Sequence, residues 1–414
     1  MKVDALRPRL WVVSELYYPE QTSTGYFLTR IAEGLADSFD VSIICGQPSY
    51  SERGIKAPRF EERHGTRIHR VRATHFDKDR LLLRAINMLT LTIAIGWFAL
   101  MHFRRGDRLL VVTNPPSVPM VTGLAARWRG VRSALLVHDV YPELLAATGL
   151  LTPQSLAYRL LAGLFGWAYR LFADIVVLGE DMAEIVSAKL GAASRPIHII
   201  PNWGDADEVV PIAREANAFR REHDLDGKFV VQFSGNIGRT HDIELLLGAA
   251  RLLRDVPDIL FLFVGYGGKT GLLSDAGNAE LANVRFLPRQ PREKLGQMLA
   301  ASDVTVISFI DGMYGISVPS RMYNVMSAGV PIIASAEPRS ALARTVAGLG
   351  AGWVLEERNA EGLAALIRSL ATTDGLAQTR QRGAAGRAGV EAHYVLPVIL
   401  DQYRALFANR PKQP

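Results

Sequence analysis

The stretch "FVVQFSGNIGRTHDIELLLGAARLL" (229–253) indicates the fold class of the chain. It begins with a mainly apolar run rich in valine and phenylalanine, and it continues through a turn bracketed by Gly235 and Gly238. It ends in a segment whose apolar residues recur at helical spacing. A short apolar run before such a helix predicts a strand that is covered on both faces, as in a parallel sheet.

The same order of strand and helix recurs along the chain. It predicts an α/β fold of two doubly wound, Rossmann-like parallel sheets in series. We expect an N-terminal domain over 1–205, a linker over 206–226, a C-terminal domain over 227–392, and a helix within 393–414 that packs back on the first domain. The predicted strands include "RLWVVSE" (9–15), "VSIICG" (41–46), "RLLVVTN" (108–114), "DIVVLGE" (174–180), "ILFLFVG" (259–265) and "VPIIAS" (330–335).

Composition and charge narrow the function classes. Apolar residues make up 49% and charged residues 21% of the 414 residues, which is typical of a globular protein. The net charge of +6 suits anionic partners, although many soluble proteins carry such an excess. Basic residues are scattered, so we expect no nucleic-acid partner. The N-terminus lacks an apolar core with a small-residue cleavage site, which predicts a cytoplasmic protein.

Metal and disulfide chemistry are not expected. Cys45 is the single cysteine, which excludes an intramolecular disulfide and a cysteine-based zinc site. The histidines show no HExxH spacing. Asp205 and Asp207 have the spacing of a metal-binding DxD, but they lie in the join between the domains. We therefore predict a site without a metal ion.

Two glycine-rich loops follow strands of the C-terminal domain. Ligands of open parallel sheets bind at the carboxyl ends of the strands, and amides at a helix start favour anions. Gly235 and Gly238 are followed by Arg239, and the next loop, "VGYGGKTGLL" (264–273), carries Lys269. The loops predict a phosphate cradle, although ordinary tight turns have the same pattern. Because no GxGxxG is present, a nicotinamide cofactor is not expected.

The segment "YGISVPSRMYNVMSAGVPIIAS" (314–335) places a cation at a helix start. Ser320 is a good N-cap, and we expect a helix from Ser320 to about Ala328. Arg321 opposes the positive end of the helix dipole, so an anion is its expected partner. Asn324 lies on the same helical face as Ser320 and can hydrogen bond to a sugar. The alternative is a solvated arginine and an asparagine without a ligand.

Polar residues also follow strands of the N-terminal domain. Gly25 precedes an amphipathic helix and could let the backbone approach a ligand, although a glycine there is usually a turn residue. The segment 137–149 could bind a hydroxylated acceptor or orient its reacting hydroxyl. Equally, its acidic residues could only cap the next helix. Its polar residues are His138, Asp139, Tyr141 and Glu143.

The segment "AINMLTLTIAIGWFALMHF" (85–103) has 19 residues without a formal charge, which is the length of a transmembrane span. It lies between predicted strands of one sheet, and a span would separate these strands across the bilayer. We expect a helix in the membrane interface, as for "YRLLAGLFGWAYRLF" (158–172). Both could equally be buried domain helices. The expected polar side of the first comprises Arg80, Arg84, Asn87, His102 and Arg105.

Several motifs follow one another in a family order across almost the whole chain. With them the chain resembles the family-4 retaining glycosyltransferases of the GT-B fold, whose two Rossmann-like domains face each other across a cleft. Within that family it looks like the bacterial enzymes that add fucose or N-acetylfucosamine-type sugars to envelope polysaccharides. The motifs are "YYPEQTSTGYFLTRIAEGLA", "HDVYPE", "IPNWGD", "FSGNIG", "VGYGGK", "NVRFLPRQPREKLGQMLAASDV" and "SVPSRMYNVMSAGVPIIAS".

The resemblance implies a nucleotide-sugar site. In it, Gly25 closes over the donor diphosphate, Gly235 and Asn236 line the phosphates, and the backbone near Leu287 faces the base. The family's paired glutamates fall on Ile316 and Asn324, and its basic pair falls on Asn236 and His241. Arg321, with Arg239 or Lys269, must then supply the positive charge.

The expected site combines both kinds of reasoning. Arg321, His138 and Asp139 are the expected catalytic residues, and Tyr141 and Glu143 are the expected acceptor-binding residues. The expected donor-binding residues are Gly25, Gly235, Asn236, Arg239, Gly265, Tyr266, Lys269, Leu287, Ser317, Val318, Ser320, Tyr323 and Asn324.

The expected activity is transfer of a sugar from a UDP- or GDP-sugar to a lipid-linked saccharide at the inner face of the cytoplasmic membrane. The resemblance implies retention of configuration, with the leaving phosphate accepting the acceptor's proton. No protein nucleophile and no cofactor are expected. Two alternatives stay open. One is an epimerase or hydrolase of the same fold, and the other is an inactive sugar-nucleotide-binding subunit, suggested by Ile316 and Asn324 at the glutamate positions.

Overall fold

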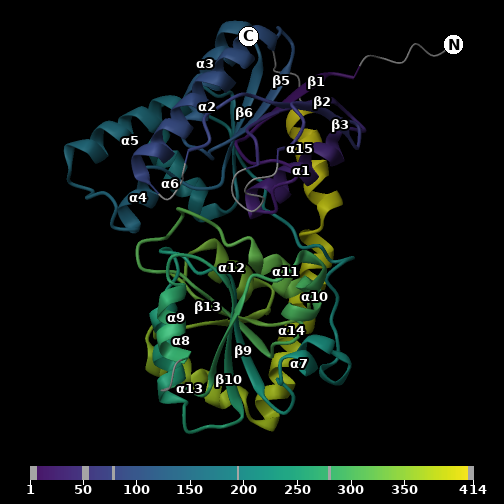
Figure 1. The fold of residues 1–414 in the computed structure, drawn as a ribbon, viewed down its shortest axis with the longest axis vertical. Helices are drawn as coiled ribbons and strands as arrows, with labels where there is room; N and C mark the ends of the chain where they lie inside the picture. Colours follow the sequence, from purple (N-terminus) through teal and green to yellow (C-terminus); the bar gives the residue numbers. More distant parts are fainter. Residues whose placement is uncertain (1–6, 49–55, 77–79, 194, 278–280, 409–414) are drawn as a thin grey trace, which may run out of the picture. The chain divides into compact units, whose positions relative to one another are not determined.

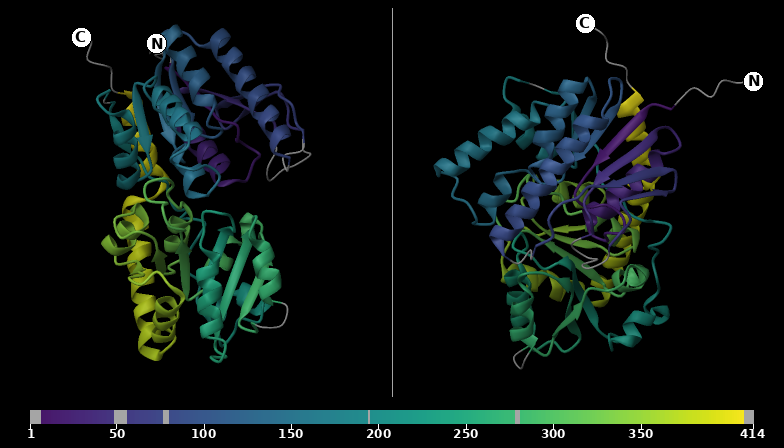
Figure 2. Two further views of the ribbon diagram at one scale, coloured as in Figure 1. Left: turned by 90° about the vertical axis from the view of Figure 1, so that its left-hand side faces the viewer. Right: turned by 45° about the horizontal axis from the view of Figure 1, so that its top comes forward.

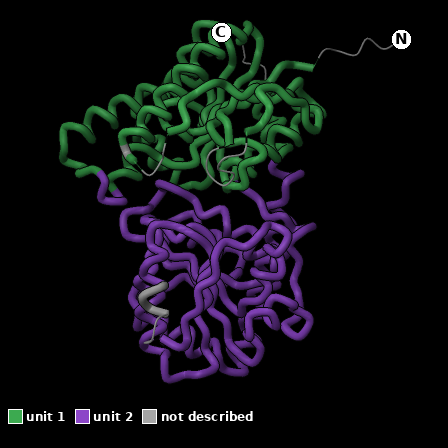
Figure 3. The backbone as a smooth tube through the Cα atoms, in the orientation of Figure 1, with its two compact units in different colours: residues 1–146, 151–201, 400–414 green, residues 147–150, 202–399 purple. Residues whose placement is uncertain are grey.

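The computed structural model describes residues 7–48, 56–76, 80–193, 195–277 and 281–408. The chain forms two compact units, which Figure 3 shows in different colours. The first unit consists of Met1–Ala146, Leu151–Pro201 and Leu400–Pro414, and the second of Ala147–Leu150 and Asn202–Ile399. Each unit holds one sheet covered by helices (Figure 1), so the predicted α/β fold of two parallel-sheet domains is confirmed.

The sheet of the first unit has eight strands in the order β3-β4-β2-β1-β5-β6-β7-β8. β3 pairs with β4 antiparallel, and the other neighbours pair in parallel. The central strands are apolar and buried, as the runs predict. The strands are β1 (Arg9–Val13), β2 (Asp40–Cys45), β3 (Phe60–Arg63), β4 (Thr66–Arg70), β5 (Arg108–Val112), β6 (Arg132–Val137), β7 (Asp174–Val177) and β8 (Ile197–Ile199).

The helices of the first unit are divided between the two faces of its sheet. The connections after β4, β5 and β6 run in one direction along the sheet, and the connection from β1 to β2 runs in the other. Because parallel crossovers are right-handed, α2, α3 and α5 cover one face and α1 covers the opposite face (Figures 1 and 2). The helices are α1 (Ser23–Leu35), α2 (Leu81–His102), α3 (Val118–Arg129), α4 (Glu143–Ala147), α5 (Leu156–Tyr169) and α6 (Glu180–Leu190).

The last helix, α15 (Leu396–Ala408), packs against α1 within the first unit. A Cβ on Gly34 would lie 2.4 Å from a methyl carbon of Leu400, so the two helices are in close contact. The rings of Phe39 and Phe407 meet at 6.1 Å, and Arg404 pairs with Asp37 at 2.8 Å. These contacts explain why the part of α15 from Leu400 onward belongs to the first unit.

The second unit has a parallel sheet of six strands in the order β11-β10-β9-β12-β13-β14. Residues 206–226, which were expected to be a linker, belong to this unit and contain η1 (Arg214–Ala216) and α7 (Ala218–Glu222). The strands are β9 (Phe229–Asn236), β10 (Ile259–Tyr266), β11 (Val284–Pro288), β12 (Val304–Ser308), β13 (Ile332–Ser335) and β14 (Gly352–Val354). The other helical elements are α8 (Ile243–Leu252), α9 (Thr270–Gly277), η2 (Arg292–Lys294), α10 (Leu295–Leu299), α11 (Arg321–Ser327), α12 (Ala341–Gly348), α13 (Ala360–Leu370) and α14 (Thr373–His393).

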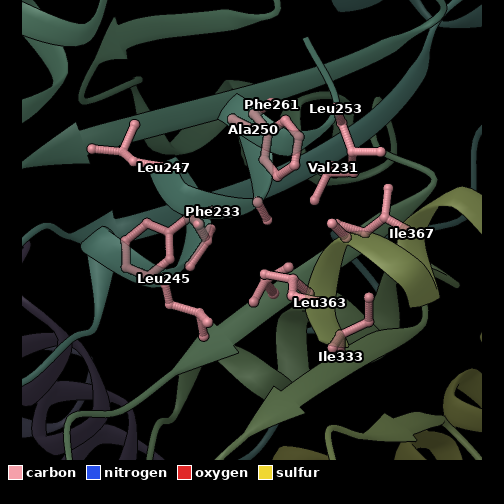
Figure 4. Close-up of a cluster of buried hydrophobic side chains, with 14 of the residues drawn as sticks. Val231, Phe233, Leu245, Leu247, Ala250, Leu253, Phe261, Ile333, Leu363 and Ile367 are labelled. Carbon is pink, nitrogen blue, oxygen red and sulfur yellow. The ribbon is translucent and has the colours of Figure 1, made fainter. Parts of the chain in front are cut away.

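A hydrophobic core fixes the strands that lead to the candidate site. Figure 4 shows Phe233 of β9 and Phe261 of β10 among side chains of α8 and α13, including Leu247 and Leu363. All four are buried. Burial of each such side chain stabilises the fold by about 1.5–3 kcal/mol. The core therefore holds the carboxyl end of β9 in one position.

The topology of this sheet marks where a ligand should bind. The chain runs outward from β9 through β10 to β11, and it then returns to β12 on the other side of β9. The carboxyl ends of β9 and β12 therefore form a topological switch point, where open α/β sheets bind their ligands. The loop after β9 and the segment between β12 and α11 both begin there.

Helix α2 runs along the surface of the first unit. By length and composition it could span a membrane, but β4 and β5, which it connects, lie in one sheet. The predicted polar side is wrong in one respect, because Asn87 is buried. Its side chain receives a hydrogen bond from the backbone N–H of Phe76 and donates one to the carbonyl of Phe76, both of 2.9 Å. The polar Asn87 therefore faces the protein.

Candidate functional site

The carboxyl ends of β9 and β10 meet through two glycines. Gly235 and Gly265 are direct neighbours in the parallel register, and their φ angles are +126° and +152°. A Cβ on Gly265 would lie 1.9 Å from the carbonyl oxygen of Gly235, so only glycine fits this approach. The next register pair, Asn236 and Tyr266, is exposed at the strand ends. The structure thus brings the two predicted loops together.

Arg321 begins α11 and reaches the end of β9. Its Nη1 donates a hydrogen bond of 2.6 Å to the carbonyl oxygen of Ser234. The guanidinium carbon stands 4.7 Å from the ring centroid of Phe233. A Cβ on Gly235 would lie 3.2 Å from Nη1, so the guanidinium packs into the space that the missing side chain leaves open.

The charge of Arg321 has no carboxylate partner within the part of the chain that the structure describes. Its neighbours are the carbonyl of Ser234 and the rings of His241 and Phe233. Burial lowers the pKa of Arg321 to about 10, so the guanidinium is still protonated at neutral pH. An enclosed cation without a protein anion is unfavourable unless a ligand supplies the opposite charge. A phosphate group would supply it.

His241 supports Arg321 as a neutral ring. Its Nδ1 lies 2.7 Å from the carbonyl oxygen of Ser308, and its Nε2 contacts Nη2 of Arg321. Because a carbonyl only accepts and a guanidinium only donates, Nδ1 carries the proton and Nε2 accepts. Burial, followed by the charge of Arg321, holds the pKa of His241 well below its ordinary value. The ring also stacks on Phe309 with centroids 5.2 Å apart.

The two other cations expected at the phosphates differ in their surroundings. Nζ of Lys269 lies 2.8 Å from a carboxylate oxygen of Glu244 and donates a hydrogen bond of 2.9 Å to the carbonyl of His241. Its charge is therefore already partnered by Glu244, and its expected role as a phosphate ligand stays a prediction. Arg239 is exposed in the loop between β9 and α8. Its role as a phosphate ligand stays a prediction.

The amide of Asn324 is bound to the segment that precedes η1. Its Oδ1 accepts a hydrogen bond of 2.8 Å from the backbone N–H of Asp205, and its Nδ2 lies 3.4 Å from the Asp205 carboxylate. Asp205 also pairs with Arg292 at 2.6 Å. A sugar would have to compete with Asp205 for the amide, so the expectation of an available Asn324 is corrected. Asp205, which sequence reasoning treated as a chance DxD, is a structural residue.

The start of α11 agrees with the sequence in its position and differs from it in some side chains. Ser320 is the N-cap residue of the helix Arg321–Ser327, as expected, but its side chain makes no capping hydrogen bond to the helix. Tyr323 is 1% exposed and its ring lies 5.0 Å from that of Tyr394, so it is a core residue and not a donor-binding side chain. Val318 is also buried, which leaves only its backbone for a ligand.

The remaining expected donor-binding residues keep surface exposure. Ser317 is partly exposed. Leu287 is half-buried on β11, in register with Val264 of β10. Tyr266 is half-exposed, and the guanidinium of Arg289 lies 5.7 Å from the centroid of its ring. Their binding roles stay predictions.

His138 lies just beyond β6 in the first unit and is buried. The backbone N–H groups of His138 and Asp139 both donate to the hydroxyl of Thr113, which fixes this turn. Nδ1 of His138 lies 3.3 Å from the hydroxyl of Thr24, and Nε2 is buried without a hydrogen-bond partner among the residues that the structure describes. Burial lowers the pKa of His138 to about 4, so the ring is neutral at physiological pH. It can therefore act only as a neutral hydrogen-bonding group there.

The other residues expected in the first unit serve its own packing. The N–H of Gly25 is capped by the hydroxyl of Thr22, and a Cβ on Gly25 would lie 2.8 Å from the carbonyl oxygen of Glu20. The glycine is thus required by the turn at 20–22. One carboxylate oxygen of Glu143 forms a 2.7 Å ion pair with the buried Lys189, and the expected role of Glu143 toward an acceptor stays a prediction. Tyr141 packs against Phe165 with ring centroids 5.9 Å apart.

Within the described ranges, no group of three or more His, Cys, Asp or Glu residues could hold a metal ion. Metal independence stays a prediction. The arrangement that the structure does present is a fixed, protonated arginine at the switch point of a parallel sheet, next to two glycine-lined strand ends. Such an arrangement can bind and neutralise an anion through side-chain charge and backbone amides.

Two family models match the chain. The model described as Glycosyl transferases group 1 matches residues 215–387, and the model described as Glycosyl transferase 4-like domain matches residues 24–203. Together they fall on the two units that the structure separates.

Whole-chain comparisons agree with the family models. The chain is 31% identical over 409 residues to WbjE of Pseudomonas aeruginosa, which is named as a glycosyltransferase, and the matched region covers 96% of this chain and 97% of WbjE. It is 26% identical to WcaI of Escherichia coli K12, named as a colanic acid biosynthesis glycosyl transferase, over 85% of this chain and 89% of that protein. The solved structure of Anabaena HepE with UDP-glucose has a TM-score of 0.70 at 14% identity, covering 97% of this chain and 99% of HepE.

Proposed function

Because the chain belongs to the group 1 glycosyltransferases and has the GT-B fold, we propose that it transfers a sugar from a nucleoside diphosphate to a lipid-linked saccharide with retention of configuration. The donor class rests on Arg321, which is protonated at the end of β9 and has no carboxylate partner among the described residues. The structure of HepE with UDP-glucose supports a donor of the same kind.

The proposed reaction uses the leaving group as its base. The bond between the anomeric carbon and the diphosphate oxygen breaks, and a bond from the acceptor hydroxyl forms on the same face of the sugar. The hydroxyl proton passes to the leaving phosphate, so atoms and charge balance without a protein nucleophile or a cofactor. Arg321 stabilises the negative charge that develops on the diphosphate. Such stabilisation is strongest in an enclosed site, where water screens it least.

His138 is proposed to act on the sugar or acceptor side. Its neutral ring offers Nε2 as a buried hydrogen-bonding atom, while Nδ1 is held near Thr24. A neutral imidazole can orient a hydroxyl group without bringing a second positive charge close to a developing oxocarbenium ion.

The acceptor and the sugar are the finer parts of the proposal. WcaI is named for colanic acid biosynthesis, which supports a role in an envelope polysaccharide. The motifs of the sequence favour a sugar of the fucose or N-acetylfucosamine type. A lipid-linked acceptor would place the protein at the inner face of the cytoplasmic membrane.

A panel of UDP- and GDP-sugars tests the proposal by thermal shift, because a ligand that binds the native state raises its apparent stability. One donor of the panel should stabilise the protein, and the Arg321→Ala variant should lose the effect. Failure of every donor to bind would contradict the proposal. Sugar release without an acceptor would favour an epimerase or hydrolase.

A specific observation favours one other function. Isoleucine and asparagine stand at the two positions where the resembled family has glutamates, so neither position presents a carboxylate. In the structure Ile316 is buried, and the side chain of Asn324 is bound to Asp205. The chain could then be a sugar-nucleotide-binding subunit. Donor binding without transfer to any extracted lipid acceptor, restored only by a second protein, would support that function.

A further inference from the structure

Helix α2 presents an apolar stripe to the outside of the first unit. Its members recur every three or four residues, which places them on one face of the helix. Leu82 is 82% exposed and Trp97 is 67% exposed. The opposite side of α2 is the one that packs on the protein, and it includes the polar Asn87 and Thr92. The stripe consists of Leu82, Ile86, Leu89, Ile93, Trp97 and Met101.

Two neighbouring helices extend the apolar stripe. The hydroxyls of Thr92 of α2 and Ser117, the residue before α3, lie 2.7 Å apart, and Gly96 of α2 packs on Val121 of α3. Gly123 of α3 packs on Leu171, which follows α5. The three helices thus lie on the same face of the sheet (Figures 1 and 2). The exposed apolar residues of α3 and α5 are Leu124, Trp128, Leu156, Leu160, Leu164 and Trp167.

The charges within these three helices have one sign. Helices α2, α3 and α5 contain no aspartate and no glutamate. Exposed arginines lie within them at Arg84, Arg127, Arg129 and Arg159, and others flank α2 at Arg80, Arg104 and Arg105. By contrast, α6, which follows in the same unit, exposes Glu180 and Glu184. Apolar helix faces that carry arginines and three exposed tryptophans match a bilayer interface rich in anionic headgroups.

We propose that the exposed apolar side chains of α2, α3 and α5, here called the apolar face, dock the first unit on an anionic lipid bilayer with the helices parallel to the membrane plane. The same bilayer would hold the lipid-linked acceptor, and this part of the proposal rests on the proposed function. α2 cannot leave the unit to span the bilayer while β4 and β5 stay in one sheet. A second copy of the chain is a poorer occupant, since a two-fold contact would bring arginines of one sign together.

The test measures binding of the full chain to sedimentable vesicles. One set contains phosphatidylcholine alone and the other contains phosphatidylcholine with phosphatidylglycerol. We expect binding to the anionic set, with loss at high salt because exposed charges are screened. The Ile93→Ser/Trp97→Ser double variant should reduce partitioning roughly tenfold or more. Arg84→Glu/Arg159→Glu should remove the preference for anionic vesicles.

A matched control and two contrary outcomes keep the test decisive. Leu252→Ser changes an apolar side chain of α8 that is 47% exposed, and it should bind vesicles as the unchanged protein does. Equal binding to both vesicle sets, or to neither, would overturn the proposal. So would a concentration-dependent dimer in light scattering that the Ile93→Ser/Trp97→Ser variant abolishes. Thermal shift by the donor panel should be unchanged in all these variants, so failure of the membrane proposal is distinguishable from failure of donor binding.

Discussion

Replacement of Arg321 by alanine should weaken binding of a nucleoside diphosphate much more than binding of the free nucleoside. The guanidinium is fixed by the carbonyl of Ser234 at 2.6 Å and by the ring of His241. Its pKa of about 10 means that one full positive charge is lost in the variant at neutral pH. A hydrogen bond to a charged group contributes about 1.5–3 kcal/mol. Loss of one such bond corresponds to roughly 10- to 150-fold weaker binding.

The assay is calorimetric titration of UDP, GDP and the two free nucleosides into the unchanged protein and the Arg321→Ala variant. Only the diphosphates should lose affinity. Circular dichroism and the Tm without ligand must first show that the variant is folded, because the guanidinium also packs on Phe233 at 4.7 Å. Arg321→Lys, which keeps the charge but not the planar fork, should fall between the two proteins.

A charge-relocation variant sharpens the result. Because Nη2 of Arg321 contacts the ring of His241, a lysine at position 241 could place an ammonium group near the same point. The Arg321→Ala/His241→Lys variant should therefore recover part of the diphosphate affinity that Arg321→Ala loses. Arg321 does not bind the diphosphate if the Arg321→Ala variant binds UDP and GDP as tightly as the unchanged protein does. The same conclusion follows if the variant loses equal affinity for the diphosphates and for the free nucleosides.

Further predictions follow from the surroundings of other residues. The pKa of His138 is about 4 in the folded protein, against an ordinary value of 6.5 that applies to the unfolded chain. As the pH falls from 6.5 to 4, the unfolded chain therefore takes up a proton that the folded protein does not, and the free energy of unfolding decreases. Urea denaturation should show a loss of about 2 kcal/mol from this group at pH 5 relative to pH 7.5, and His138→Asn should reduce that loss. Gly265→Ala would place a Cβ 1.9 Å from the Gly235 carbonyl oxygen and should destabilise the protein by about 2–3 kcal/mol. A Cβ on Gly268 would have no neighbouring atom within 4 Å among the described residues, so Gly268→Ala should be nearly neutral. Thermal melting of both variants measures the difference. Asp205→Ala keeps the backbone N–H that bonds to Asn324 but removes the carboxylate contacts with Arg292 and with Nδ2 of Asn324, so it should lower the free energy of unfolding by about 1–3 kcal/mol, while retained stability would contradict its structural role.

The fold was accessible from the sequence because its signal is local. The strand, loop and helix of residues 229–253 appear as β9, the glycine turn and α8. Continuous apolar runs report burial on both faces, and a parallel sheet then follows from the helices between them. The position of Arg321 at the start of α11 was accessible for the same reason, since it depends on neighbouring residues.

Side-chain partners were not accessible where they come from distant segments. Asn324 is bound by Asp205, which lies 119 positions earlier, and Glu143 is paired with Lys189, which lies 46 positions later. Asn87 faces inward because the backbone of Phe76 and the hydroxyl of Thr74 form hydrogen bonds with its amide. A helical pattern shows which residues share a face, but it does not show which face a distant segment will cover.

The support of Arg321 by His241 illustrates the same limit. The residues are 80 positions apart, and neither alone indicates the contact. The available signal was indirect: a histidine at a position where the resembled family carries a cation, and a cation at a helix start that lacks an acidic neighbour. The structure joins the two observations by placing the ring and the guanidinium in contact.

A crystal structure of the full chain with UDP or GDP, whichever binds more tightly, would show whether Arg321 binds the diphosphate of a donor. We expect a phosphate oxygen within hydrogen-bonding distance of the Arg321 guanidinium, beside the carboxyl end of β9 at Gly235. A diphosphate bound elsewhere, with Arg321 still donating only to Ser234 and His241, would rule out this role of Arg321.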